Sequence, residues 1–419
     1  MSVHVISQQS VGYLLECHDC GLVQNVPHLE NGMCARCTRC NATLEHYRSY
    51  SLRHAYAYGC VGAICFIMAN FLPFIKLEIG GRAQEASLVT GIISLYDQGQ
   101  WLLSLVVAFT MLIAPGIKLL SQLAALTSLH MRPPAVWLIA LHSHASLVNR
   151  WAMIEVYMLG LIVAYVKLID LASVELGTGV FALVALMLAT VACDALADHE
   201  SILRHLERHK ALAKRDESQA HQSETPPGND NCKAAAFSNA PPLALQHRRK
   251  HNSLTRSWAL VITAAILYIP ANLMPVMTIT SLGASEAETI LSGIISLADS
   301  GMWPLAILVF FASILVPMLK LCGLILLLVP TQRGLAWRLR ERTALYRLIE
   351  FLGRWSMIDI FVLSILAALV QLGQIATIEP GTGAVAFAAV VIITMIASQT
   401  FDPRLMWDVA TPPYGKTID

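Results

Sequence analysis

Long apolar runs alternate with short polar stretches along most of this chain. Runs long enough to cross roughly 30 Å of hydrocarbon predict eight membrane-spanning helices. Their predicted bounds are 55–79, 101–126, 151–171, 179–197, 258–279, 303–329, 357–378 and 383–400. So little polar chain separates these runs that eight buried helices of a large soluble protein are a poor alternative. The pattern therefore predicts an all-α membrane protein.

The predicted spans fall into two copies of one pattern. Four motifs of the first half recur in the second, at Asn70-Phe-Leu-Pro73 and Asn272-Leu-Met-Pro275, Gly91-Ile-Ile-Ser-Leu95 and Gly293-Ile-Ile-Ser-Leu297, Pro115-x-x-Lys118 and Pro317-x-x-Lys320, and Arg150 to Glu155 and Arg354 to Asp359. Such internal repetition predicts a tandem repeat of two four-helix units. Because each unit holds an even number of spans, we expect both to have the same orientation.

Composition and charge support this class and argue against others. Apolar residues make up 56% of the chain and charged residues 14%, against about 25% charged in soluble proteins. A net charge of +1 gives no reason to expect a nucleic-acid partner. Lys and Arg gather before the first span, between the fourth and fifth, and between the sixth and seventh. Since basic loops stay inside, we expect both termini in the cytoplasm, and residues 1–50 contain no signal-peptide core.

These features divide the chain into five segments. They are a cytoplasmic zinc ribbon at 1–50, a first four-helix unit at 51–198, a cytoplasmic linker with a degenerate second ribbon at 199–252, a second four-helix unit at 253–403, and a cytoplasmic tail at 404–419. The linker is too polar to bury a core. The repeat places Gln219, Gln222, Asn239 and Pro242 where the ribbon has cysteines. We therefore expect one metal ion per chain.

The first polar segment contains two Cys-x2-Cys pairs. Cys17 with Cys20 and Cys37 with Cys40 have the spacing of a four-thiolate zinc ribbon. A zinc ion with four protein ligands has no open position, so it is structural and activates no water. Tetrahedral sulfur does not choose between zinc and iron, and an iron site is an alternative.

A further cysteine, Cys34, offers a second way to pair Cys37. The residue after the second cysteine of a knuckle usually turns with positive φ. Gly21 and Asn41 tolerate that conformation, whereas the β-branched Thr38 does not. We therefore assign Cys17, Cys20, Cys37 and Cys40 as the ligands and leave Cys34 as a spare thiol.

Two lysines lie inside predicted spans. Lys118 and Lys320 occupy the second span of each unit, where an ammonium group is costly unless it reaches the interface or finds a partner. The expected partners are Glu155 and Asp359, near the cytoplasmic starts of the third spans. Such a pair could be a static link between two helices, or it could exchange protons during a transport cycle.

The first spans each carry an Asn-x-x-Pro motif near their outer end, at Asn70 and Pro73 and at Asn272 and Pro275. Proline removes one helical hydrogen bond, and the asparagine can satisfy the freed carbonyl. The motif therefore predicts a kink in each first span, which could act as a gate or could be only a matter of shape.

Together these motifs resemble the paraquat-inducible protein A family over nearly the whole chain outside the linker. The resemblance implies a bacterial inner-membrane protein that works with a periplasmic MCE-domain partner to move phospholipid between membranes. It also implies that Lys320 and Asp359 match polar positions inside the transmembrane region. The chain departs from the family at a second zinc ribbon, which many relatives keep and this sequence has lost.

We therefore expect a component of an intermembrane lipid transport system, with an apolar path between the two four-helix units. The alternatives are a membrane scaffold or stress-response sensor that uses the ribbon to recruit a partner, and an ion-coupled small-solute carrier that uses Lys320 and Asp359. The chain has no HExxH, Gly-x-Ser-x-Gly or phosphate-loop motif, so we do not expect an enzyme.

Overall fold

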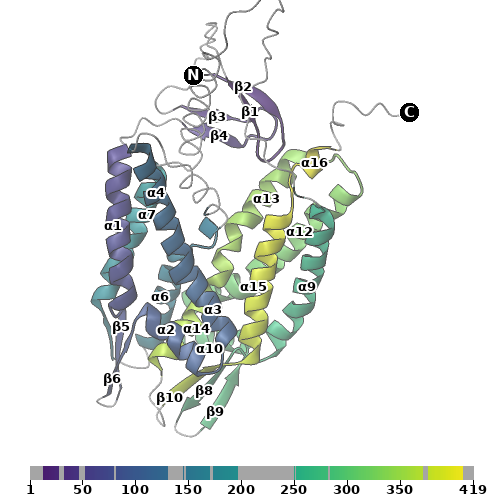
Figure 1. Cartoon of the computed structure of the whole chain (residues 1–419). Coiled ribbons are helices and arrows are strands. Elements are labelled where there is room, and N and C mark those ends of the chain that lie inside the picture. The colour runs from purple at the N-terminus through teal and green to yellow at the C-terminus, as the bar shows by residue number, and fades with distance from the viewer. Residues whose placement is uncertain are drawn as a thin grey trace, which may run out of the picture.

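The computed structural model describes residues 13–27, 33–46, 52–79, 82–130, 145, 148–169, 173–196, 250, 252–281, 284–370 and 376–408. These residues form mainly helices, with a ribbon of short strands at one end (Figure 1). Apart from residues 250 and 252, the predicted linker at 199–252 lies outside the described residues, including the four positions of the degenerate ribbon. Residues 409–419 of the predicted tail lie outside them as well.

Apart from α13 (Leu339–Gly353) and η3 (Trp355–Met357) of the second half, the described helices and strands follow the same order in both halves. The first half consists of α1 (Leu52–Phe71), β5 (Ile75–Ile79), β6 (Arg82–Ala86), α2 (Leu88–Asp97), α3 (Trp101–Ala108), the π-helical turn η1 (Phe109–Ile113), α4 (Ala114–His130), α6 (Ile154–Ile169), β7 (Ser173–Leu176) and α7 (Thr178–Leu196). The second half consists of α9 (Ser253–Leu273), β8 (Met277–Ser281), β9 (Ala284–Glu288), α10 (Ile290–Asp299), α11 (Trp303–Phe310), the π-helical turn η2 (Phe311–Leu315), α12 (Val316–Gln332), α13 (Leu339–Gly353), the 3-10 turn η3 (Trp355–Met357), α14 (Ile358–Leu369), β10 (Ala376–Pro380) and α15 (Thr382–Thr400).

Among the described residues, seven helical stretches are long and apolar enough to cross a membrane. They are His54–Phe71, Trp101–Thr127, Thr178–Leu196, Ser253–Leu273, Trp303–Gln332, Leu339–Leu369 and Thr382–Thr400. The predicted span at 151–171 corresponds to α6, whose 16 residues fall just short of the 17 or so that usually cross a bilayer. The predicted span at 357–378 ends as a helix at Leu369 and begins much earlier, since α13 leads into it.

The first and fifth predicted spans extend too far. The helices end at Phe71 and Leu273, and the residues beyond them form the strands β5 and β8. Asn70 and Asn272 donate to the carbonyl oxygens of the residues four positions earlier, at 2.6 Å and 2.8 Å. The prolines Pro73 and Pro275 follow the last helical residue. The motif therefore ends each helix instead of kinking it, because proline and the residue before it resist helical geometry.

The structure contains four small antiparallel sheets, which the all-α prediction missed. Strands β1 (Tyr13–Glu16), β2 (Val23–Val26), β3 (Cys34–Arg36) and β4 (Thr43–His46) form two hairpins in the ribbon. The other two sheets have the orders β6-β5-β7 and β10-β8-β9 and lie at the end of the molecule opposite the ribbon (Figure 1). Such short strands give a weak signal beside long apolar helices.

In each of these two sheets, the residues just before the central strand form hydrogen bonds with the Gly-Thr-Gly stretch at the start of the last span. Gly177 N donates to Phe74 O at 2.7 Å and Gly179 N to Pro73 O at 2.9 Å. A Cβ on Gly177 would lie 2.2 Å from Pro73 O, so no larger residue fits there. Gly381 and Gly383 repeat these bonds to Val276 O and Pro275 O. Two motifs that are distant in the sequence thus form one joint in each half.

The two halves meet along their third spans. Figure 1 shows α6, α14 and α2 together at the centre of the molecule. A Cβ on Gly160 of α6 would lie 3.1 Å from Phe361 Cβ of α14, and one on Gly91 of α2 would lie 2.9 Å from Ser364 Oγ. In return, Val163 and Val166 of α6 pack against residues of α10 and α11, namely Ile290, Ile294, Leu297, Leu305 and Ala306. Each half therefore places its third span against the other half.

Because each third span packs against the other half, the two halves are not separate four-helix units with an apolar path between them. Residues of α6 and α14 belong to one continuous apolar core, and Phe361 and Leu369 are completely buried in it. Along the seam between α6 and α14, the side chains of the described residues pack directly against each other, so the expected apolar passage does not run between these two helices. The interdigitated apolar faces could be recognised only once the topology had placed them together.

Candidate functional site

The ribbon holds a compact cluster of four thiols. The sulfur atoms of Cys17, Cys20, Cys37 and Cys40 all lie within 4.8 Å of one another, and all four residues are buried. Cys17 Sγ is 3.5 Å from Cys40 Sγ, and Cys20 Sγ is 3.5 Å from Cys37 Sγ. Cys34 is exposed in β3 and lies outside the cluster. The structure thus brings together the four cysteines that the spacing selected.

Two matching turns place the thiols. Gly21 has φ 69° and Asn41 has φ 59°, as the knuckle geometry predicts. Each donates its backbone N–H to the carbonyl of the first cysteine of its pair, at 2.9 Å for both Cys17 and Cys37. The positive φ lets the chain turn back so that both sulfurs of a pair point the same way. The choice between Cys34 and Cys40 was therefore correctly made from backbone chemistry.

The cluster has the dimensions of a metal site. Tetrahedral coordination at a metal–sulfur distance of about 2.3 Å requires sulfurs about 3.8 Å apart, close to the two distances of 3.5 Å. No other group of three or more potential ligands lies this close together among the residues that the structure describes. Four buried thiols are the donor set of a structural site, and they leave a bound ion no open position for substrate.

The ribbon is attached to the second half by two ion pairs, one partly exposed and one largely buried. Arg347 of α13 lies 2.7 Å from an Asp19 carboxylate oxygen and also donates to Cys40 O at 3.3 Å. Arg404 lies 2.7 Å from Glu16 Oε1. No pattern in the sequence predicts these contacts, because each joins residues more than 300 positions apart. They connect the thiol cluster directly to the membrane domain.

Lys320 is a buried cation inside the membrane domain. The residue is 1% exposed, and its Nζ donates to Thr394 Oγ1 of α15 at 2.8 Å. Gly353 of α13 lies beside the ammonium group, since a Cβ at this glycine would be in ordinary contact with Nζ at 3.8 Å. Among the described residues, no carboxylate lies within 4.0 Å of Nζ. The expected pair with Asp359 is therefore not formed.

Lys118, the counterpart of Lys320, is in a different environment. Its Nζ lies 2.6 Å from Asp194 Oδ2 of α7, and Gln122 Nε2 donates to the other oxygen at 2.5 Å. Its expected partner Glu155 is an exposed residue of α6. Asp194 is one turn from the end of a span, a position from which sequence reasoning could not tell which helix it faces. Lys118 therefore has a carboxylate partner, but not the expected one.

Asp359 lies where the two halves meet. Its Oδ2 is buried and has no hydrogen-bond partner among the described residues. Ser313 of η2, whose hydroxyl donates to Val309 O at 2.7 Å, and Lys167 of α6, from the other half, are its polar neighbours. The charge of Glu288, at the end of β9, acts on Lys167 as well. Sequence reasoning missed Lys167, although a lone lysine in the apolar run of α6 was a usable signal.

The second half thus contains a set of buried polar groups that can bind and release protons. The same region holds the buried hydroxyls of Ser313, Ser356, Ser364 and Thr394, which are at most 2% exposed, and Thr394 accepts a hydrogen bond from Lys320. Buried charges are costly unless they are paired, so ionisable residues at membrane depth mark proton or substrate pathways.

Fold and site together define a multi-pass helical membrane protein with a cysteine ribbon attached to its second half. Residues 52–207 and 254–411 each match the family described as Paraquat-inducible protein A. These two segments cover most of the chain, so the protein belongs to the paraquat-inducible protein A family.

The chain is similar to several curated proteins over almost its full length. The chain is 30% identical over 404 residues to the "Intermembrane transport protein PqiA" of Escherichia coli (strain K12), covering 94% of this chain and 95% of that protein. It is 31% identical over 408 residues to the "Lipophilic envelope-spanning tunnel protein A" of the same strain, covering 94% and 90%. It is 27% identical over 419 residues to a "Probable intermembrane transport protein" of Haemophilus influenzae, covering 94% and 96%. No solved structure matches the chain.

Proposed function

We propose that this protein is the integral inner-membrane component of an intermembrane lipid transport system. In this role it passes phospholipid between the inner membrane and a periplasmic MCE-domain partner. The observation that carries the proposal is the similarity, over 94% of the chain, to relatives named for intermembrane transport and for a lipophilic tunnel across the envelope. Buried ionisable residues in the membrane domain fit a transporter better than a passive anchor.

The proposal includes eight membrane spans formed by a tandem repeat. Seven stretches meet the length criterion, and α6 is the eighth because it holds the same place in the first half as α14 does in the second. The two matches to one family, at 52–207 and 254–411, support the duplication. Basic residues near the ribbon, such as Arg36 and Arg39, favour cytoplasmic termini.

A structural zinc ion held by Cys17, Cys20, Cys37 and Cys40 is part of the proposal. Bound zinc would supply the folding free energy that such a short segment lacks. Asp19 and Glu16 then hold the folded ribbon on Arg347 and Arg404. We assign the metal to stability of the ribbon and not to chemistry on the lipid.

The closed seam suggests how protons could drive transport. Asp359 of α14 and Lys167 of α6 lie on opposite sides of the seam and act on each other electrostatically. A change of charge on either group alters the attraction between the two helices. We propose that proton exchange at Asp359 and Lys320 lets α14 separate from α6, which opens a path for acyl chains that the resting structure keeps closed.

Purification of the full chain in mild detergent, followed by mass spectrometry of the retained lipids and proteins, tests this function. We expect phospholipid together with an MCE-domain protein. Recovery of a cytoplasmic protein with neither would support the scaffold or sensor alternative. Proton-coupled uptake of a small solute into vesicles, without lipid transfer, would support the carrier alternative.

A further inference from the structure

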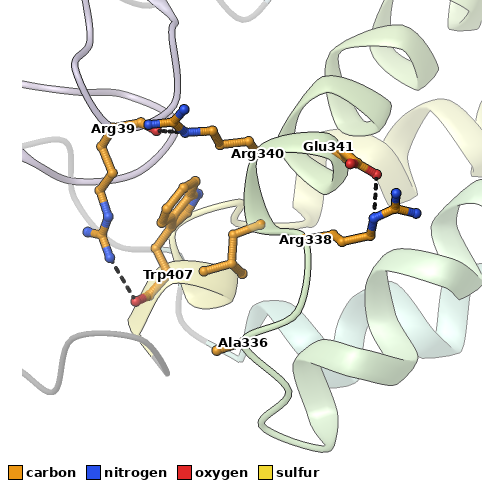
Figure 2. A pocket seen from close by; sticks show the side chains of 7 residues that line it. Arg39, Ala336, Arg338, Arg340, Glu341 and Trp407 are labelled. Carbon is orange, nitrogen blue, oxygen red and sulfur yellow. Dashed lines mark hydrogen bonds and ion pairs between the residues drawn. The ribbon is translucent and has the colours of Figure 1, made fainter.

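A second candidate binding site lies between the ribbon and the membrane domain. It is a pocket of about 340 Å³ lined by residues of the ribbon, of the start of α13, and of the short helix α16 (Leu405–Asp408). Small-molecule sites have volumes of about 300–1,000 Å³. Figure 2 shows the Trp407 indole between Arg39 of the ribbon and Arg338 at the start of α13. The transport proposal does not use this pocket.

The lining of the pocket is basic. Arg39, Arg338 and Arg340 contribute three guanidinium groups, whereas Glu341 contributes the one acidic group of the lining. Arg39 stacks over the Trp407 ring at 4.4 Å and donates to its carbonyl oxygen at 3.4 Å. Arg340 donates to Arg39 O at 2.8 Å. The same contacts that attach the ribbon to α13 and α16 therefore fix the positions of Arg39 and Arg340.

The start of α13 adds to this positive potential. Leu339, Arg340 and Glu341 are its first residues and line the pocket. The first N–H groups of a helix have no acceptor within the helix, and no side chain caps this end. The guanidinium groups of the lining and these N–H groups both favour a phosphate, because both can donate charge-assisted hydrogen bonds to its oxygens.

The surroundings of the pocket point to a lipid as the source of the phosphate. The loop between α12 and α13 also carries Leu335 and Trp337, whose side chains are 50% and 65% exposed. Exposed tryptophan beside arginine is typical of the boundary between headgroups and acyl chains. Basic pockets on the cytoplasmic side of membrane helices bind anionic lipid headgroups.

We propose that this pocket binds the phosphate of an anionic phospholipid in the cytoplasmic leaflet. Binding would bridge Arg39 of the ribbon and Arg338 of α13, so the lipid would help to hold the ribbon on the membrane domain. The inference uses the cytoplasmic placement of the ribbon proposed above. Its test measures lipid retention and not transport, so the two proposals can fail separately.

Native mass spectrometry of the full chain in detergent tests the site. The protein is offered equal amounts of phosphatidylglycerol and phosphatidylcholine. We expect wild type to retain phosphatidylglycerol preferentially, and Arg338→Asn to weaken this retention about fivefold to tenfold. Asparagine is chosen because residue 338 has φ 47°, which asparagine tolerates. Arg338 pairs with Glu341 and lies over the Trp337 ring, and neither residue belongs to the ribbon, so the variant leaves the ribbon in place.

Two further variants and one competitor complete the design. Glu341 lies 3.0 Å from Arg338, so Glu341→Gln should strengthen retention by releasing that arginine. Arg333→Gln removes a nearby exposed charge outside the pocket lining and should leave retention unchanged. Equal losses in Arg333→Gln and Arg338→Asn, or equal retention of both lipids, would overturn the proposal. Displacement of the lipid by inorganic phosphate alone would assign the pocket to a soluble anion and also overturn it.

Discussion

The same Pro-x-x-Lys motif has two different environments in this protein. Lys118 reaches Asp194 at 2.6 Å, with 14% of its side chain exposed, whereas Lys320 is buried against the hydroxyl of Thr394. Both lysines occupy the same position in their helices, so the difference comes from the helices that pack around them. A buried cation at membrane depth that has no carboxylate partner lowers the stability of the folded protein. We therefore expect Lys320 to be there for its function and not for stability.

Replacement of Lys320 by methionine should separate a structural role from a functional one. Methionine has a similar length and is apolar, so Lys320→Met should leave the folded protein intact or stabilise it. We expect transfer of labelled phospholipid from vesicles to fall about tenfold or more, as for the loss of a proton-transfer group. Lys118→Met is the matched control and should retain transfer. Full activity of Lys320→Met would show that this lysine takes no part in transport.

The cysteine cluster makes a second prediction for single residues. Cys20→Ser replaces a thiolate by a hydroxyl, which is a poor zinc ligand, so the metal content of the purified protein should drop from about one ion per chain to well below one. Cys34→Ser is the control, because this exposed cysteine lies outside the cluster. Elemental analysis measures both. Equal metal loss in the two variants would mean that Cys34 belongs to the site.

At the level of elements, the joint between each first span and each last span depends on glycine. Gly177→Ala would place a methyl group 2.2 Å from Pro73 O, and the backbone on both sides is fixed by hydrogen bonds. Overpacking of this kind costs about 1–3 kcal/mol, so the unfolding temperature in detergent should fall. Gly116→Ala is the control, since its new Cβ meets only Phe66 at 3.6 Å and alanine favours the helix. A fall for Gly116→Ala but not for Gly177→Ala would contradict this account of the joint.

For the whole molecule, the exchange of third spans decides how the two halves are joined. A Cβ at Gly160 lies 3.1 Å from Phe361 Cβ, near the range of about 3.5–4.5 Å that disulfides require. The pair Gly160→Cys and Phe361→Cys should therefore cross-link on mild oxidation, and mass spectrometry of the digested protein should find the linked peptides. Gly116→Cys with Phe361→Cys should not cross-link. Two separate four-helix units would give no link in either pair.

Much of this architecture could be predicted from residue patterns. Apolar runs predicted most of the helices, and the repeated motifs predicted the order that the described elements of both halves have in common. The Cys-x2-Cys spacing, together with Gly21 and Asn41, predicted which thiols cluster. These features depend on near neighbours along the chain, where helix length, turn conformation and ligand spacing are determined by local chemistry.

Tertiary structure alone decided which groups meet across long separations. It paired Lys118 with Asp194, placed Lys320 against Thr394 with no carboxylate partner among the described residues, and brought Lys167 near Asp359. It also filled the seam between the halves and joined the ribbon to Arg347 and Arg404. An apolar or charged side chain specifies what kind of neighbour it needs but not which one, because packing satisfies that need with whatever residue the topology brings within reach.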